Sequence, residues 1–146
     1  MTEREIKSQF LCQIYYEDTD LSGFVYHANY LKYFERAREH LIGITFLSRL
    51  LQQGIHFVVS QASLTYLSPS RHGDRLRIES CGRYSNSPAI SFDQIAWLEG
   101  EERKCCDAKI TIVALNHKNK PVRLPGMIIE HFNSEIAGHS MPESLS

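Results

Sequence analysis

Alternating apolar and polar positions predict five strands and one long helix along this chain. The strand-like segments are rich in β-branched and aromatic residues and cover residues 9–16, 55–67, 74–84, 88–98 and 104–115. Residues 27–42 instead repeat their apolar side chains at helical spacing, and Gly43 provides a stop. The apolar stripe of this helix consists of Tyr30, Tyr33, Phe34, Ala37 and Leu41. Shorter helices are predicted over residues 45–53 and 127–132.

The turns between the later strands indicate an antiparallel sheet. The segments SPSRHGD, SNSP and EGEE are short and rich in turn formers, whereas parallel strands need long crossover connections. An apolar helix with few helical partners must pack on the sheet. We therefore expect one α+β domain over residues 1–134, in which the antiparallel sheet wraps around one long central helix. Residues 135–146 are expected to form a flexible C-terminal tail.

Composition narrows the functional classes. The chain has 146 residues, of which 42% are hydrophobic and 23% charged, as is typical of a single soluble domain. A net charge of -1 lacks the basic excess of nucleic-acid-binding domains, so no nucleic-acid partner is expected. The first residues have no signal-peptide pattern, and no stretch is long and apolar enough to cross a bilayer. The cysteines show no zinc-like spacing and are expected to be reduced thiols of a cytoplasmic protein: Cys12, Cys81, Cys105 and Cys106.

Three carboxylates stand directly before the long helix, at Glu17, Asp18 and Asp20. A helix N-terminus offers unpaired N–H groups and the positive end of the helix dipole, which stabilise an oxyanion or a polarised carbonyl. A carboxylate near such a point could act as a general base or as a nucleophile. The same residues could instead only cap the helix and balance its dipole. The residue pattern alone leaves both interpretations open.

This region also resembles a known enzyme family. The likeness is carried by the run Tyr15-Tyr16-Glu17-Asp18-Thr19-Asp20, by Gly23, by Val25-Tyr26-His27-Ala28-Asn29-Tyr30 and by Glu35-Arg36-Ala37-Arg38. These residues resemble the signature of the 4-hydroxybenzoyl-CoA thioesterase family of hot-dog-fold proteins. The likeness is closest to its subgroup of short acyl-CoA thioesterases associated with the Tol-Pal gene cluster. Weaker similarity continues to residues 124–125, so the resemblance covers most of the chain.

The resemblance implies a hot-dog fold and the hydrolysis of an acyl-CoA thioester to a free acid and coenzyme A. It assigns Asp20 as general base or nucleophile, and the backbone N–H of His27 as the group that polarises the thioester carbonyl. The His27 imidazole could contact the substrate or Asp20, or could be a surface or capping group. No metal or other cofactor is expected, because the signature accounts for these side chains. The segment 21–24 departs from the family pattern, and the bulkier Leu21 and Phe24 are expected to reshape the acyl pocket.

Neighbouring residues are given supporting roles. Asp18 is expected to hold the loop, and Asn29 to fix it through side-chain hydrogen bonds to the backbone. Tyr26 is expected to pack against the sheet rather than to act as an acid. Glu35 could form a simple surface pair with Arg38, three residues further on, worth about 0.2–0.5 kcal/mol.

The phosphates of coenzyme A and the open edges of a curled sheet lead to two further expectations. A basic rim could be supplied by loop residues that could equally be ordinary solvated charges, namely Arg71, His72, Lys118, Lys120 and Arg123. The resemblance implies an active site at a subunit interface, and pairing with a second copy would cover an open sheet edge, so a homodimer or homotetramer is expected.

Two other functions stay open at this stage. One is hydrolysis of acyl groups carried by acyl carrier protein. The other is a non-catalytic binding module for acyl-CoA or for partners at the cell envelope. A hot-dog hydratase is disfavoured, because its paired Asp and His belong to a different motif at the start of the helix.

Overall fold

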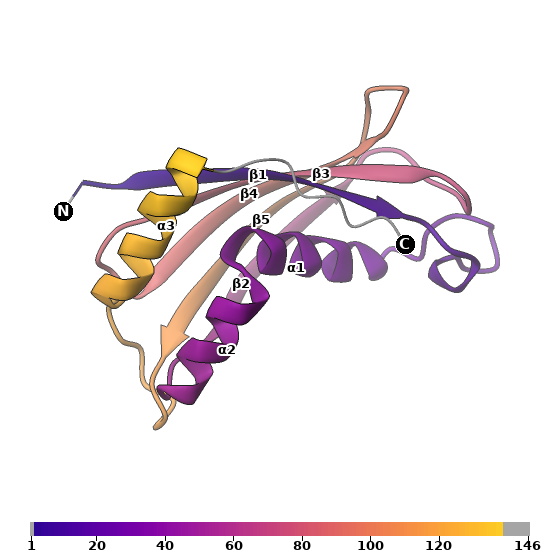
Figure 1. Ribbon diagram of the computed structural model, residues 1–146. Helices are drawn as coiled ribbons and strands as arrows, with labels where there is room; N and C mark the ends of the chain where they lie inside the picture. The colour runs from indigo at the N-terminus through magenta and orange to yellow at the C-terminus, as the bar shows by residue number, and fades with distance from the viewer. Residues whose placement is uncertain (1, 139–146) are drawn as a thin grey trace.

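The computed structural model describes residues 2–138 and contains nine elements (Figure 1). In chain order they are β1 (Arg4–Gln13), the single 3-10 turn η1 (Tyr16–Asp18), α1 (Asn29–Ile42), α2 (Ile44–Gln52), β2 (His56–Tyr66), β3 (Arg75–Tyr84), β4 (Ala89–Leu98), β5 (Arg103–Leu115) and α3 (Gly126–Gly138). No helix in this part of the chain is long and apolar enough to cross a membrane.

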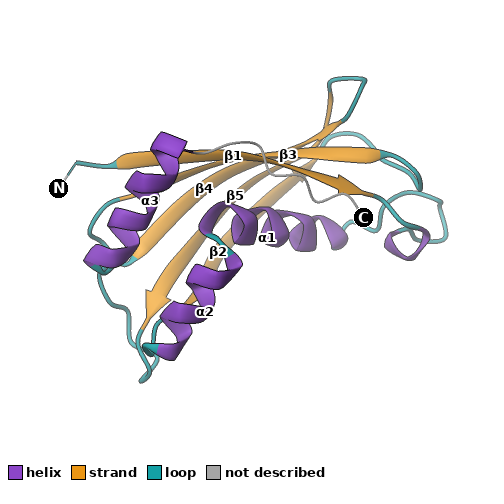
Figure 2. Ribbon diagram, viewed as in Figure 1, coloured by secondary structure: helices purple, strands orange, loops and turns teal. Residues whose placement is uncertain are grey.

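The strands form one sheet in the order β1-β3-β4-β5-β2, and every neighbouring pair is antiparallel, as predicted. Strands β1 and β2 are therefore the two edges of the sheet. The sheet curves around α1, and α2 continues from the C-terminal end of that helix (Figure 2). The loop before α1 lies at one end of the molecule and α2 lies at the other (Figure 1).

The predicted apolar stripe is the side of α1 that packs in the core. All five of its residues are buried: Tyr30, Tyr33, Phe34, Ala37 and Leu41. Alternate residues of β3 and β4 meet them from the sheet, including Leu76, Ile78, Ile90 and Phe92. Burial of aromatic and branched side chains contributes roughly 1.5–3 kcal/mol each, so this interface fixes the rotation of α1. The loop that leads into the helix is fixed with it.

Some predicted boundaries were wrong. β1 begins at Arg4 rather than at residue 9, because the alternation of outward charges and inward Ile6, Ser8 and Phe10 already starts there. It ends at Gln13, because the chain turns into η1 at Tyr16. The last helix runs from Gly126 to Gly138 and is longer than the predicted residues 127–132. Residues 135–138 of the predicted tail belong to this helix, and residues 139–146 lie outside the described residues.

Candidate active site

A tight turn presents Asp20 beside the start of α1. The Gly23 N–H donates to the Asp20 carbonyl at 3.0 Å, and the Asp20 N–H donates to the Phe24 carbonyl at 2.9 Å. Gly23 has a φ of 85°, a conformation that glycine adopts without steric cost. Thr19 and Val25 then pair as an antiparallel bridge and close the base of the turn. The Asp20 side chain is consequently exposed at the tip of a well-defined loop.

Ser22 fixes one oxygen of the Asp20 carboxylate. Its backbone N–H donates to Asp20 Oδ1 at 2.9 Å, and its hydroxyl donates to the same oxygen at 2.5 Å. The hydroxyl and then the N–H lower the pKa of Asp20 below its ordinary value, and the nearby His27 adds to this effect. Within residues 2–138 no hydrogen bond reaches Oδ2. Asp20 is thus an ionised carboxylate with one oxygen held and the other free.

The start of α1 supplies a hydrogen-bond donor. The N–H groups of residues 29–31 donate to the carbonyls three positions back. Among the described residues, in contrast, none accepts a hydrogen bond from the N–H of His27 or of Ala28. The Tyr66 hydroxyl at the end of β2 donates to the His27 carbonyl at 3.0 Å and so holds this part of the backbone. A free N–H at the positive end of a helix is a suitable partner for developing negative charge.

Asp20 and His27 line one cleft with a volume of about 370 Å³. Tyr66 forms part of its wall, and the ring of Tyr66 meets that of His27 edge-on at 6.0 Å. Tyr30 lines it from α1, and its hydroxyl is paired with Ser70 Oγ at 2.6 Å. The cleft is therefore partly aromatic and is lined by a residue with a free carboxylate oxygen and by a residue with a free N–H. This combination of groups suits attack on a carbonyl carbon.

Asp18 and Asn29 hold the loop as predicted. The Asn29 side-chain amide donates to the Asp18 carbonyl at 3.1 Å and to its Oδ1 at 3.2 Å. The other carboxylate oxygen of Asp18 accepts the Tyr15 N–H at 2.9 Å, which caps η1. The alternative that Asp20 caps the long helix is wrong, because Ala28 occupies the N-cap position of α1 and no side chain of residues 2–138 caps it.

Two packing predictions were also wrong. Tyr26 is 45% exposed rather than packed on the sheet, because it precedes the helical periodicity, and its ring lies 4.6 Å from that of His27. The predicted surface pair between Glu35 and Arg38 does not form among the described residues. Arg38 falls on the sheet-facing stripe of α1, so it is buried and donates to Gln94 Oε1 at 3.0 Å. Glu35 is exposed and does not line the Asp20 cleft.

Of the two bulky residues that depart from the family pattern, Phe24 lines the cleft, whereas Leu21 is fully exposed and does not. Arg71, a predicted coenzyme A contact, lies beside this cleft. It forms an isolated bridge with Phe24, and its guanidinium lies 4.5 Å from the centre of the Phe24 ring. His72 follows it, and its ring is 6.0 Å from that of Tyr16.

The other predicted basic contacts lie far from Asp20 of the same chain. Lys118, Lys120 and Arg123 follow the end of β5, which pairs with the start of β2, whereas the cleft lies at the end of β2. The 11 residues of β2 span about 35 Å. One chain therefore does not bring these three residues to its own cleft.

Comparison with known proteins identifies the family. The sequence profile of the thioesterase-like superfamily matches residues 15–132. The chain belongs to this superfamily. It is 32% identical to the acyl-CoA thioester hydrolase YbgC of Escherichia coli O6:H1 over 123 residues, which is 82% of this chain and 91% of that relative. It is 35% identical to the acyl-CoA thioesterase YbgC of Haemophilus influenzae over 119 residues, 80% of this chain and 87% of that one.

A solved structure supports the fold of this thioesterase-like chain. The crystal structure of a 1,4-dihydroxy-2-naphthoyl-CoA thioesterase from Synechocystis superposes with a TM-score of 0.79 and 20% sequence identity. The superposition covers 93% of this chain and 99% of the Synechocystis chain. The hot-dog fold and the family resemblance expected from the sequence are thereby confirmed.

Sequence reasoning missed two residues that shape this thioesterase-like site. Ser22 was noticed only as part of a departure from the family pattern, although Asp-x-Ser-Gly is typical of a turn in which the aspartate accepts hydrogen bonds two residues on. Tyr66 gave no local signal, because its contact with His27 joins residues 39 positions apart.

Replacing Ser22 with alanine is expected to shift the pH dependence of this thioesterase-like protein. The hydroxyl lowers the pKa of Asp20, so its loss raises that pKa, and Asp20 becomes protonated at a higher pH than in the wild type. If Asp20 must be ionised, the acidic limb of the kcat/KM profile moves to higher pH. Thioester hydrolysis measured from about pH 4 to pH 8 tests this, and Ser22→Thr, which keeps the hydroxyl, is the matched control. Superimposable acidic limbs for Ser22→Ala and wild type would contradict the expectation.

Proposed function

We propose that the chain hydrolyses acyl-CoA thioesters, with Asp20 as the catalytic carboxylate and the His27 N–H as the donor to the thioester carbonyl. The reaction class is supported by the family and by two relatives whose names state it. The observation that carries the residue assignment is that one cleft is lined both by Asp20, whose Oδ2 accepts no hydrogen bond, and by His27, whose N–H donates none among the described residues.

In this mechanism the thioester carbonyl oxygen accepts the His27 N–H, and negative charge on it is stabilised by the start of α1. Tyr66 keeps the peptide in position through the His27 carbonyl. Ser22 holds Oδ1 of the carboxylate through two hydrogen bonds and leaves Oδ2 available for the reaction. The exposed position of Asp20 gives water access, and its lowered pKa keeps it ionised.

Two routes fit this arrangement. As a general base, Asp20 takes a proton from water, the new C–O bond forms, and the C–S bond breaks to release the coenzyme A thiolate. As a nucleophile, Asp20 forms a mixed anhydride while the thiolate leaves, and water then cleaves the anhydride. Thiolates leave readily, so neither route requires a strong general acid, a metal or another cofactor.

The enzyme is proposed to act as a pair of identical subunits joined through β2. This pair is either the whole assembly or the repeating unit of a larger one, such as a tetramer. Edge β1 carries charged residues at Arg4, Glu5 and Lys7, which discourage pairing with another strand. Edge β2 has no aspartate, glutamate, lysine or arginine in its 11 residues. Large hydrophobic side chains are exposed on and beside it, at Val58, Val59, Tyr66 and Leu67. An uncharged edge flanked by exposed apolar side chains suits pairing with a second copy.

Arg71 is the proposed coenzyme A contact of the same chain, because it lies beside the cleft. Lys118, Lys120 and Arg123 could contribute only from another subunit. A cytoplasmic location is proposed as well, and it agrees with four free cysteines, of which three are buried.

The test is release of coenzyme A, followed with a thiol reagent, over short, long and aromatic acyl-CoAs and the same acyl groups on acyl carrier protein. Turnover of the coenzyme A substrates is expected. Turnover of carrier-bound substrates alone would shift the assignment to that class. Tight acyl-CoA binding without turnover by folded protein would identify a binding module.

A further inference from the structure

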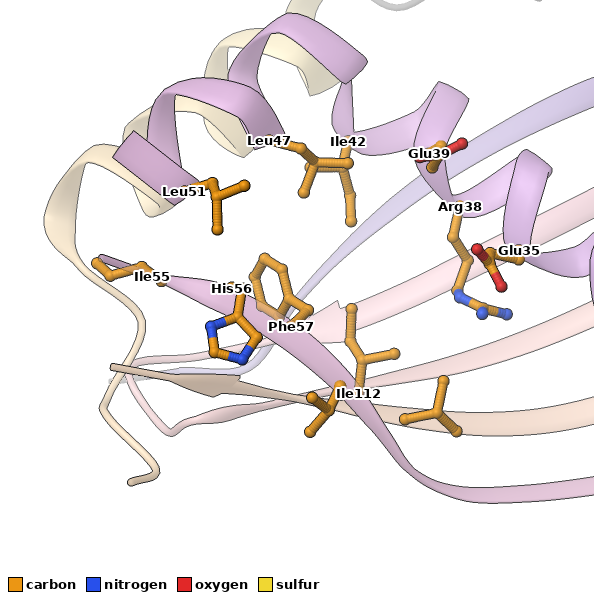
Figure 3. A pocket seen from close by; sticks show the side chains of 12 residues that line it. Glu35, Arg38, Glu39, Ile42, Leu47, Leu51, Ile55, His56, Phe57 and Ile112 are labelled. Atoms are coloured by element: carbon orange, nitrogen blue, oxygen red, sulfur yellow. The ribbon is translucent and has the colours of Figure 1, made fainter. Parts of the chain in front are cut away.

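A second pocket lies at the other end of α1, between α1, α2 and β2 (Figure 3). Its volume is about 350 Å³, which is the size of a small-molecule site. Most of the wall is apolar and comes from four elements. Ile42 belongs to α1, Leu47 and Leu51 to α2, Phe57 and Val58 to β2, and Ile112 to β5. The pocket has room for a small apolar group, and its specificity must come from its few polar side chains.

One of these polar side chains is a buried cation. Arg38 lines the pocket and is only 6% exposed. Its side chain extends from α1 toward the strands (Figure 3). A guanidinium has five N–H donors, but in residues 2–138 Arg38 donates a single hydrogen bond, to Gln94, and forms no ion pair. In the described residues, only Ser8 Oγ and Tyr33 Oη are fully buried side-chain atoms without a hydrogen-bond partner. The unused N–H groups of Arg38 are therefore still accessible, and an acceptor on a ligand in the pocket can reach them.

Gln94 fixes the direction of this guanidinium. The Gln94 side chain is fully buried, and its amide nitrogen donates to the Phe34 carbonyl at 3.0 Å and to Ser80 Oγ at 2.9 Å. Both amide hydrogens are therefore used, and the amide oxygen can only face Arg38. Arg38 is thus preorganised by the core rather than free to swing into solvent.

The charges at the pocket rim limit what Arg38 can bind. Glu35 and Glu39 also line the pocket and are exposed. Two carboxylates beside one guanidinium repel an anionic ligand, whereas an uncharged oxygen acceptor meets no such repulsion. The polar groups therefore favour a hydroxyl or keto oxygen over a carboxylate.

Pairing through β2 would join this pocket to the catalytic cleft. The Arg38 pocket includes the start of β2, from His56 to Val59, and the Asp20 cleft includes its end at Tyr66. In an antiparallel pair of β2 strands, the start of one lies beside the end of the other. The Arg38 pocket of one subunit then opens beside the Asp20 cleft of its partner. Within one chain, Arg38 lies ten positions after the N-cap residue Ala28, which is roughly 15 Å along α1.

We propose that the Arg38 pocket of one subunit receives the distal part of the acyl group whose thioester lies in the Asp20 cleft of the other subunit. In this pocket Arg38 selects acyl groups that carry an uncharged oxygen acceptor. The assignment rests on the proposed thioesterase function and on the dimer.

The first experiment compares kcat/KM for pairs of acyl-CoAs that are matched in length and differ by one distal hydroxyl or keto oxygen. The wild type is expected to prefer the oxygenated member about 10-fold or more, as one charge-assisted hydrogen bond allows. Arg38→Met should bring this ratio close to one. Because both kcat/KM values are measured on the same protein sample, their ratio does not depend on how much of the variant is folded. Arg38→Lys keeps a positive charge and a donor toward Gln94, so it should give an intermediate ratio.

Arg36→Met is the matched control, since Arg36 belongs to the same helix but is exposed and does not line the pocket. It should leave the ratio unchanged. The proposal is overturned if the wild type shows no preference, if Arg38→Met retains it, or if an acyl-CoA ending in a carboxylate is the preferred substrate. Absence of turnover on every thioester would instead refute the proposed function.

Mixed dimers test whether the two halves of the site come from different subunits. A chain with Asp20→Asn is combined with a chain carrying Arg38→Met, and the mixed species is purified with two tags. If the site is shared, one of its two sites is intact, and the wild-type preference for the oxygenated substrate is retained. If each chain supplies both halves, the active site lacks Arg38 and the preference is lost, which would refute the shared pocket.

Discussion

Asp20→Asn should lower kcat by about 100-fold or more at neutral pH, the usual contribution of a positioned carboxylate base. The substitution keeps the size of the side chain, and the amide oxygen can still accept the two hydrogen bonds from Ser22. The loop geometry should therefore persist, so the loss reports chemistry rather than folding. The expected result holds for both routes, because an amide is neither a base nor an effective nucleophile near pH 7. Coenzyme A release under saturating acyl-CoA measures it.

Glu17→Gln is the matched control for this variant. Glu17 is an exposed carboxylate in the same segment, but it does not line the cleft. It should stay close to wild-type activity, which separates the effect of Asp20 from a general loss of negative charge near α1. Near-normal turnover by Asp20→Asn, with unchanged circular dichroism, would remove Asp20 from the mechanism.

The sequence predicted the fold because the fold rests on periodic burial. Phe34, Ala37 and Leu41 repeat at helical spacing, and the alternation in residues 74–84 and 88–98 matches the inward residues of β3 and β4. Such patterns are local and survive without knowledge of the partner surface. The start of the edge strand β1 was predicted too late, because the charged residues Glu5 and Lys7 flank the inward-facing Ile6 and make this stretch polar on average.

The site was predictable only where its chemistry lies in one stretch of chain. Asp20 and His27 belong to a continuous motif, and the structure places both in one cleft. Tyr66 reaches the same cleft from a distant strand, and no sequence spacing encodes that contact. Arg38 was misread as a surface residue because charged side chains on helices are usually exposed. Its burial depends on Gln94, which lies 56 positions away and supplies an acceptor inside the core.

Placing lysines on edge β2 is expected to separate the proposed dimer and to lower its activity strongly. If two β2 strands pair about Gln61, the centre of the strand, position 59 of one chain lies opposite position 63 of the other. The double variant Val59→Lys and Ser63→Lys would then place like charges face to face at two points, which opposes strand pairing. Both side chains are exposed in the single chain, so its own fold should tolerate them. Light scattering should find the 16.8 kDa chain instead of at least twice that mass.

The expected loss of activity in this variant follows from the proposal that two subunits share each site. Asp20 and His27 stay intact in the monomer, yet the cleft would lack the wall that the second subunit is proposed to supply. The value of kcat/KM should therefore fall by about 100-fold or more, which is the loss expected when a substrate is no longer held in reacting geometry. Gln9→Lys on the opposite edge β1 is the control and should change neither the mass nor the activity. A fully active monomer would show that one chain holds a complete site. A dimer that resists both lysines would show that the subunits pair through a different surface.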